Sequence, residues 1–354
     1  MTYHHCPDCP PSPERSLSRR DFIRQGAGVA GVAALAAAGG AIPLVGIAAA
    51  AKPGAGNAAG SETLVKTFYQ SLSESQRARI CFPFDHELRK EVDNNWQITD
   101  VPVRAYSPDQ QAMIKEIFIG MHSPEYAETV YSQVVHDSGR RGFEGGSAVA
   151  IFGEPGTGDF EFVLTGRHCT RRCDGESVEG TAFGGPIFYG HAAGGFNEGP
   201  GHEGNAYWYQ ALRANEVFEM LDGKQRKQAL AHRGRKEDGR ATVALTGQKK
   251  GLEGIRVADL SADQKGHVRK VVKDILAPFR QRDAREALRL VEAAGFDNLH
   301  MAFYQEQDIG NDGVWDVWQI EGPSAVFYFR GDPHVHAWIH VRDSAVEKGD
   351  PFKA

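Results

Sequence analysis

Residues 148–168 read AVAIFGEPGTGDFEFVLTGRH and decide the fold class. Two apolar runs, 148–153 and 160–165, flank a turn rich in glycine and proline, which is typical of a β-hairpin. Strand patterns return near the C-terminus with turn residues between them, at 314–321, 324–330 and 334–341. We therefore expect an antiparallel sheet built from hairpins, with strands near 147–168 and 314–341.

Helical patterns fill the first and middle parts of the chain, at 107–119, 125–136, 207–221 and 264–294. Three helix starts share a phrase of Leu, then Ser or Asp, then Gln and a basic residue, beginning at Leu72, Leu221 and Leu260. This phrase predicts a capping box. Its unequal spacing excludes an array with a fixed period, so we expect three capped helices with similar structural roles. Together these patterns predict an α+β fold, with capped helices packed against the sheet.

The N-terminal segment carries an export pattern. Residues 18–23 read SRRDFI and precede a soft apolar run at 27–51, as in a twin-arginine signal. Small residues at 49–51 favour cleavage near Lys52, and an uncleaved anchor is the alternative. We expect the twin-arginine translocase as a transient partner and a periplasmic or extracellular location. Because this route carries folded proteins, a metal could be inserted before export.

The rest of the chain divides into a flexible lead-in at 52–61, a single large domain at 62–343 and a tail at 344–354. A formal net charge of −6 argues against a nucleic-acid partner. No second apolar stretch of membrane length follows the signal, so we expect no membrane contact after cleavage. Basic residues between Lys224 and Arg240 are interrupted by Glu237 and Asp238, which favours a solvated helix end and loop over a phosphate site.

Three cysteines remain after the expected cleavage, at Cys81, Cys169 and Cys173. Their odd number excludes a complete disulfide framework. Cys169 and Cys173 could form a disulfide in an oxidising envelope if the chain turns back between them. They could also be metal ligands or ordinary thiols.

Residues 334–340 read HVHAWIH and carry the most suggestive chemistry. In a strand, the three histidines and Trp338 share one face, while the intervening apolar residues face the core. His334 and His336 lie close enough to hold one metal ion together. His340 lies about 13 Å further along, at ~3.3 Å per residue, which makes it a poor partner for the same ion. Trp338 is expected in the core rather than stacked on a ligand.

A third ligand is expected from the strand that begins at Phe160, because the same alternation places His168 at the end of its apolar row. We predict that His168, His334 and His336 converge on a divalent ion, with zinc, copper and iron all allowed by these ligands. His202 is a further ligand candidate, as are His191 and His340. The alternative is a set of histidines whose hydrogen bonds are satisfied internally.

Three stretches taken in order resemble the bacterial domain-of-unknown-function 3500 family: FVLTGRH at 162–168, GPIFYG at 185–190 and GDPHVH at 331–336. The resemblance spans residues 62–343 and implies polar motif positions at His168, His334 and His336. It implies no activity. Members of the family carry a second histidine where this chain has Arg167, and that replacement favours an anion-binding role for Arg167.

These observations favour a metal-dependent hydrolase or lyase, or an oxidative enzyme, that acts on a small polar or sugar-like substrate. A metal-bound water would be the nucleophile, Glu203 a proton carrier and Arg167 a substrate-binding group. The sequence contains no phosphate loop, no Gly-x-Ser-x-Gly elbow and no His-Glu-x-x-His motif. A binding protein without turnover is the second hypothesis.

Overall fold

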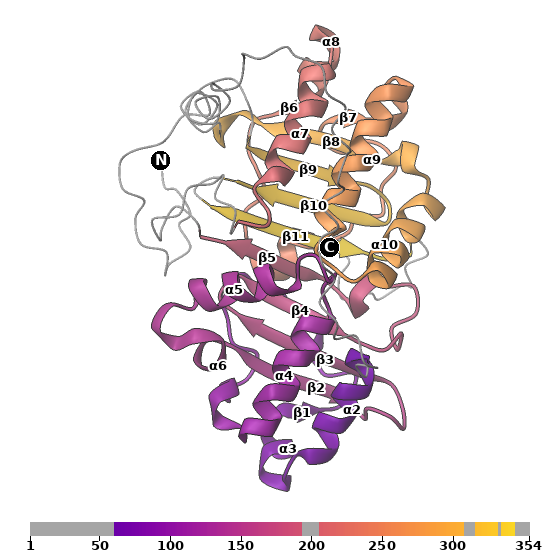
Figure 1. The fold of residues 1–354 in the computed structure, drawn as a ribbon. Helices are drawn as coiled ribbons and strands as arrows, with labels where there is room; N and C mark the ends of the chain where they lie inside the picture. The colour runs from indigo at the N-terminus through magenta and orange to yellow at the C-terminus, as the bar shows by residue number, and fades with distance from the viewer. Residues whose placement is uncertain (1–59, 193–204, 308–315, 332–333, 344–354) are drawn as a thin grey trace, which may run out of the picture.

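The computed structural model describes residues 60–192, 205–307, 316–331 and 334–343 (Figure 1). The predicted export signal, most of the lead-in, His202, Glu203 and the tail lie outside these residues. Within the described part, no helix combines the length and apolar character needed to cross a membrane.

One mixed sheet of 11 strands runs through the described molecule and is antiparallel at most of its pairs (Figure 1). Only its two outermost pairs, β1 with β2 and β6 with β8, are parallel. The predicted hairpin at 148–165 is confirmed, as is the α+β class. Along the sheet the order is β1 (Cys81–Phe82), β2 (Ala148–Gly153), β3 (Phe160–Gly166), β4 (Cys169–Cys173), β5 (Ile187–His191), β11 (Val335–Val341), β10 (Ala325–Arg330), β9 (Val317–Glu321), β8 (His300–Tyr304) and β6 (Leu230–Ala231), and β7 (Ile255–Arg256) pairs with β8 beside this path.

The two halves of the sheet repeat one succession of elements. Each half has a helix, a short capped helix, a two-residue edge strand, two longer helices and four antiparallel strands. β5 meets β11 at the centre, with Ile187 opposite Ile339, so the strand order is the same from either edge. The helices are α2 (Ser61–Ser71), α3 (Glu74–Ile80), α4 (Pro108–Gly120) and α5 (Ala127–Asp137) in the first half, and α7 (Tyr209–Met220), α8 (Gly223–Ala229), α9 (Ala262–Leu276) and α10 (Gln281–Ala293) in the second; the short α6 (Gly142–Gly146) follows α5.

The repeated capping phrase has a structural reason. Capping boxes form at all three predicted starts and also at Ser107, which begins α4. They occur as two pairs: the Gln76 side chain donates to Gln110 at 2.9 Å, and Gln225 donates to Gln264 at 3.1 Å. The second glutamine of each pair also donates to the carbonyl of the residue that ends an earlier helix. Gln110 donates to Ser71 of α2, and Gln264 donates to Met220 of α7. The phrase therefore fastens the same helix junction once in each half.

The long helices cover one face of the sheet, the face toward the viewer in Figure 1. The apolar side chains of β11, from Val335 to Val341 in alternation, enter the large core beneath these helices. The opposite face of β11 is also buried, and there Trp338 packs against Phe188 with ring centroids 4.6 Å apart. The predicted alternation along this strand and the core position of Trp338 are confirmed. The histidines of β11 thus lie on the sheet face away from the long helices.

Candidate metal centre

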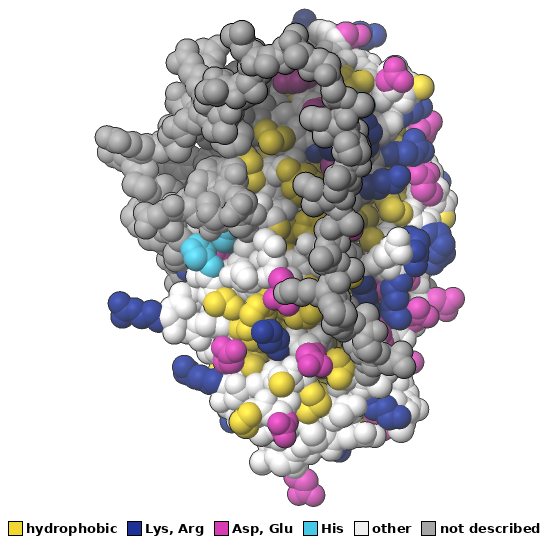
Figure 2. All heavy atoms as spheres, in the orientation of Figure 1, with side chains coloured by type: hydrophobic (Ala, Val, Ile, Leu, Met, Phe, Trp, Pro, Cys, Tyr) yellow, Lys and Arg dark blue, Asp and Glu magenta, His cyan; other side chains and the backbone are white. Residues whose placement is uncertain are grey.

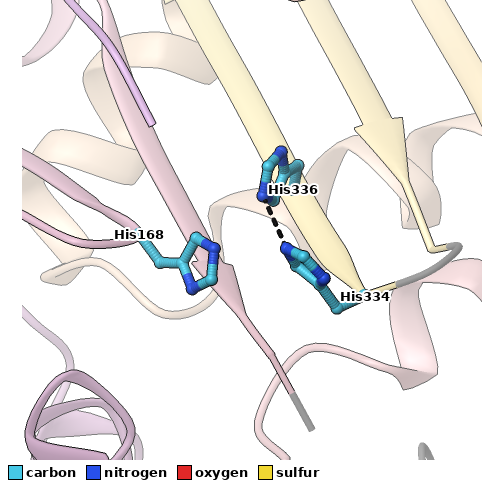
Figure 3. Close-up of side chains that lie close together, drawn as sticks. All are labelled: His168, His334 and His336. Carbon is cyan, nitrogen blue, oxygen red and sulfur yellow. Dashed lines mark hydrogen bonds between the residues drawn. The ribbon is translucent and has the colours of Figure 1, made fainter. Parts of the chain in front are cut away.

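Three buried histidines converge where the two halves of the sheet meet (Figure 3). His336 lies on β11, His334 directly precedes that strand, and His168 reaches them from the turn between β3 and β4. One ligand nitrogen from each ring lies within 4.8 Å of the others. The two Nε2 atoms of His334 and His336 are 3.0 Å apart. The three rings therefore lie together as predicted, and the ion that they would bind stays a prediction.

The route by which His168 reaches this centre differs from the prediction. β3 ends at Gly166, and Arg167 and His168 form the two-residue turn of a hairpin. His168 has φ of +56°, a conformation that costs a non-glycine residue about 1 kcal/mol or more. Its N–H donates to the Asn94 carbonyl at 2.7 Å, and its carbonyl accepts from the Gly190 N–H at 3.2 Å. The turn and these two bonds, rather than strand alternation, direct the imidazole.

Gly190 makes room for the three rings. It lies opposite His336 in the β5–β11 ladder. A Cβ atom at this position would lie 2.4 Å from the Val335 carbonyl oxygen, 3.2 Å from the His336 ring and 3.4 Å from the His168 ring. Only glycine therefore allows the two imidazoles to meet over β5. The sequence motif at 185–190 contained this residue, but a role for it requires the register of the sheet.

Two carboxylates, the buried Asp137 and the half-buried Glu237, hold two of the imidazoles by their Nδ1 atoms. Asp137, the last residue of α5, accepts from His168 at 2.6 Å through Oδ2, and Glu237 accepts from His336 at 2.5 Å through Oε2. A neutral imidazole has one N–H, so donation from Nδ1 leaves Nε2 with a lone pair for a metal ion. Carboxylates that orient histidines in this way are usual at protein metal sites.

Arg330 is a second partner of this carboxylate–imidazole pair. Its Nε donates to Glu237 at 2.7 Å, and its Nη2 lies 2.5 Å from Nδ1 of His336. In the tautomer that leaves Nε2 of His336 free for a metal ion, Nδ1 carries the proton and donates it to Glu237; in the other tautomer Nδ1 accepts from Nη2 of Arg330. Glu237 is thus held from two sides, although the basic residues around it in the sequence suggested a solvated loop. Glu237 itself is half-buried, and most side chains from Lys224 to Arg240 are half-buried or exposed, as expected of a helix end and loop.

The charge states suit a divalent cation. Burial lowers the pKa of His336 to about 4, helped by Arg330, and burial with the neighbouring histidines holds the pKa of His334 well below its usual value. Burial alone would raise the pKa of Asp137, but His168 and the other imidazole partners outweigh it and keep the pKa well below normal. For Glu237, burial likewise opposes Arg330 and His336, and the net pKa is low. Neutral imidazoles beside ionised carboxylates are what a metal requires.

The structure places the other predicted site residues as follows. His340 donates its Nδ1–H to the Val243 carbonyl at 3.0 Å and is outside the cluster as expected. Arg167 is half-buried beside His168, and its role as an anion-binding group stays a prediction. His191 lies within reach of Asp137 rather than of the three-histidine centre. His202 and Glu203 lie outside the described residues.

The predicted Cys169–Cys173 disulfide is wrong. The two residues begin and end the same strand, β4, and both thiols are free and buried. Four strand steps of ~3.3 Å separate their Cα atoms by about 13 Å, beyond the ~6.8 Å limit for a disulfide. Neither belongs to a metal-ligand group among the residues described. Burial raises the pKa of both thiols, so of the three alternatives they are buried, unreactive side chains.

Fold and site together define an α+β protein with buried histidine–carboxylate clusters that could hold a metal ion. The chain belongs to the family described as "Protein of unknown function (DUF3500)", whose profile matches residues 56–345. The resemblance of the three sequence motifs is thereby confirmed. No curated protein and no solved structure matches the chain.

Proposed function

We propose that the protein is an exported, metal-dependent hydrolase or lyase whose ion is bound by His168, His334 and His336. The observation that supports it is the convergence of three imidazoles, two of them held by carboxylates. Three protein ligands are typical of catalytic zinc sites, where a further position stays open to water or substrate. A metal in this position would supply an activated water near neutral pH.

The protein side chains would divide the remaining work. Asp137 and Glu237 would keep the two Nε2 atoms unprotonated and aimed at the ion, and their charges would offset part of the cation's charge. We propose Arg167, the neighbour of His168, as the group that binds an anionic part of a small polar or sugar-like substrate. Glu203 is proposed as the proton carrier. The last two roles rest on the sequence.

A non-catalytic metal-binding protein is the second candidate, and burial favours it. The exposed fractions of His336, His168 and His334 are 0, 1 and 8%. A chelator followed by re-addition of zinc, copper or iron separates the two functions. An enzyme should lose and regain turnover of chromogenic esters, phosphoesters or glycosides in step with one metal. A binding protein should regain the metal with no turnover of any substrate.

We also propose export by the twin-arginine route, on the strength of the sequence at residues 18–23. The double substitution Arg19→Lys and Arg20→Lys should leave the precursor in the cytoplasm, because the paired guanidinium groups are the recognised feature. Fractionation and immunoblotting measure this directly, with Arg24→Lys as the matched control. Normal export of the double variant would contradict the proposed route.

A further inference from the structure

We propose a second metal site, formed by His136, Asp137 and His191, beside the three-histidine centre. His136 and Asp137 end α5, and His191 ends β5. The Nδ1 atoms of His191 and His136 lie 3.0 and 3.4 Å from the same carboxylate oxygen, Oδ1 of Asp137. One ligand atom from each of the three residues lies within 4.8 Å of the others. Two imidazoles and a carboxylate are a common ligand set for zinc.

The electrostatics of Asp137 call for a cation at this place. Its side chain is fully buried and lies at the C-terminus of α5, where the helix dipole presents partial negative charge. Among the described residues its ion-pair partners are imidazoles, without a lysine or arginine. The Ala192 N–H also points to both of its oxygens, at 3.4 and 3.3 Å. A buried carboxylate in this position needs positive charge, from a metal ion or a protonated imidazole.

The two sites use different atoms of Asp137. Oδ2 accepts from His168, whereas Oδ1 faces His136 and His191. A carboxylate and the His168 ring would therefore separate the two ions, unlike the directly adjacent ions, ~3.5–4 Å apart, of two-metal catalytic sites. The second ion would not bind the same substrate atom as the first. Its site is distinct and stands whether or not the first site has an activity.

The second site is also closer to solvent. The side chain of His136 is 35% exposed, while those of Asp137 and His191 are buried. Figure 2 shows the molecule from the same side as Figure 1. Histidine side chains reach its surface at one place, near the ends of α5 and β5. The His136 ring would therefore be the first ligand that an ion from solvent meets at this site.

Sharing of Asp137 couples the two sites. An ion on Oδ1 would draw charge from the carboxylate, weaken its hydrogen bond with His168 and make the Nε2 of His168 a poorer ligand. Each ion should therefore lower the affinity of the other by the same factor, about fivefold or more for a typical coupling.

Cobalt(II) titration of tag-free protein, followed by its visible absorption and by elemental analysis, tests this proposal. The wild type should bind two ions per chain. The pair His136→Gln with His191→Gln, and the pair His334→Gln with His336→Gln, should each bind one, with different spectra. His232→Gln, a change of an exposed histidine, should still bind two. The His136→Gln/His191→Gln variant keeps only the three-histidine site. Its affinity for that ion should be about fivefold higher than the affinity of the same site in the wild type when the second site is occupied.

Two outcomes separate this proposal from the proposed function. A single ion in the wild type that survives the His136/His191 changes would overturn the second site and leave the three-histidine site intact. A single ion that survives the His334/His336 changes but is lost with His136 and His191 would support the second site and overturn the proposed function. Should the His136/His191 double variant fail to fold, the single change His136→Gln at a partly exposed side chain decides the matter, because it should abolish one of two ions.

Discussion

Gly190→Ala should abolish metal binding at the three-histidine centre and lower the free energy of unfolding by about 3 kcal/mol, the upper end for overpacking. The added Cβ would lie 2.4 Å from the Val335 carbonyl oxygen, a backbone atom that cannot move without disturbing the β5–β11 ladder. This ladder joins the two halves of the sheet. The same Cβ would press on the rings of His336 and His168, which have to approach each other above it.

Urea denaturation and cobalt(II) titration measure the two effects. Gly266→Ala is the matched control, because its Cβ would meet no atom within 4 Å and the residue lies inside α9. Alanine there should raise stability by about 0.5–1 kcal/mol through helix propensity, with metal affinity unchanged. Wild-type metal affinity in Gly190→Ala would show that the three rings do not meet in the way described.

Asp137→Asn and Glu237→Gln should each weaken metal binding at the three-histidine centre by about 10- to 100-fold. Each change keeps the shape of the side chain but removes the charge that orients one imidazole, His168 or His336. Glu237→Gln should also destabilise the fold by about 3–5 kcal/mol, because Arg330 would keep a buried charge with a lost partner. The adjacent change Asp238→Asn, at an exposed ion pair, is the control and should alter neither property.

Isothermal titration of the folded variants gives the affinities, and thermal unfolding without metal gives the stability. Equal affinities in Glu237→Gln and Asp238→Asn would mean that Glu237 serves only to neutralise Arg330. In that case His336 would be held by sheet packing alone.

Features that depend on residues close together in the chain, such as strand alternation and helix caps, could be predicted from the sequence. The histidines at 334 and 336 follow strand alternation, and the helix caps follow a four-residue phrase, so both could be identified from the chain alone. The pairing of the capped helices was hidden because the fourth copy, at Ser107, follows Tyr106 instead of leucine. The two-half architecture therefore became visible only in the strand order of the sheet.

The residues around the histidines depend on tertiary contacts. Asp137 is 31 residues from His168 in the chain, and Glu237 is 99 residues from His336. No spacing rule links such positions, and the basic neighbours of Glu237 made it resemble a surface residue. His168 was predicted to lie beside His334 and His336 because the strand from Phe160 was expected to continue to it. The strand ends at Gly166 instead, and a two-residue turn places the His168 ring beside the other two. A disulfide between Cys169 and Cys173 required the chain to turn back between them, but the two residues begin and end one strand.

An anomalous difference map from a crystal of tag-free protein grown with zinc would show directly whether the three histidines bind a metal ion. A peak is expected at the three-histidine centre, with a nitrogen of His168, His334 and His336 each at about 2.0–2.1 Å. The Nε2 atoms of His334 and His336, now 3.0 Å apart, should separate slightly to surround the ion. If saturating zinc gives no peak there, and His334 and His336 keep their mutual contact, the three histidines are not a metal centre.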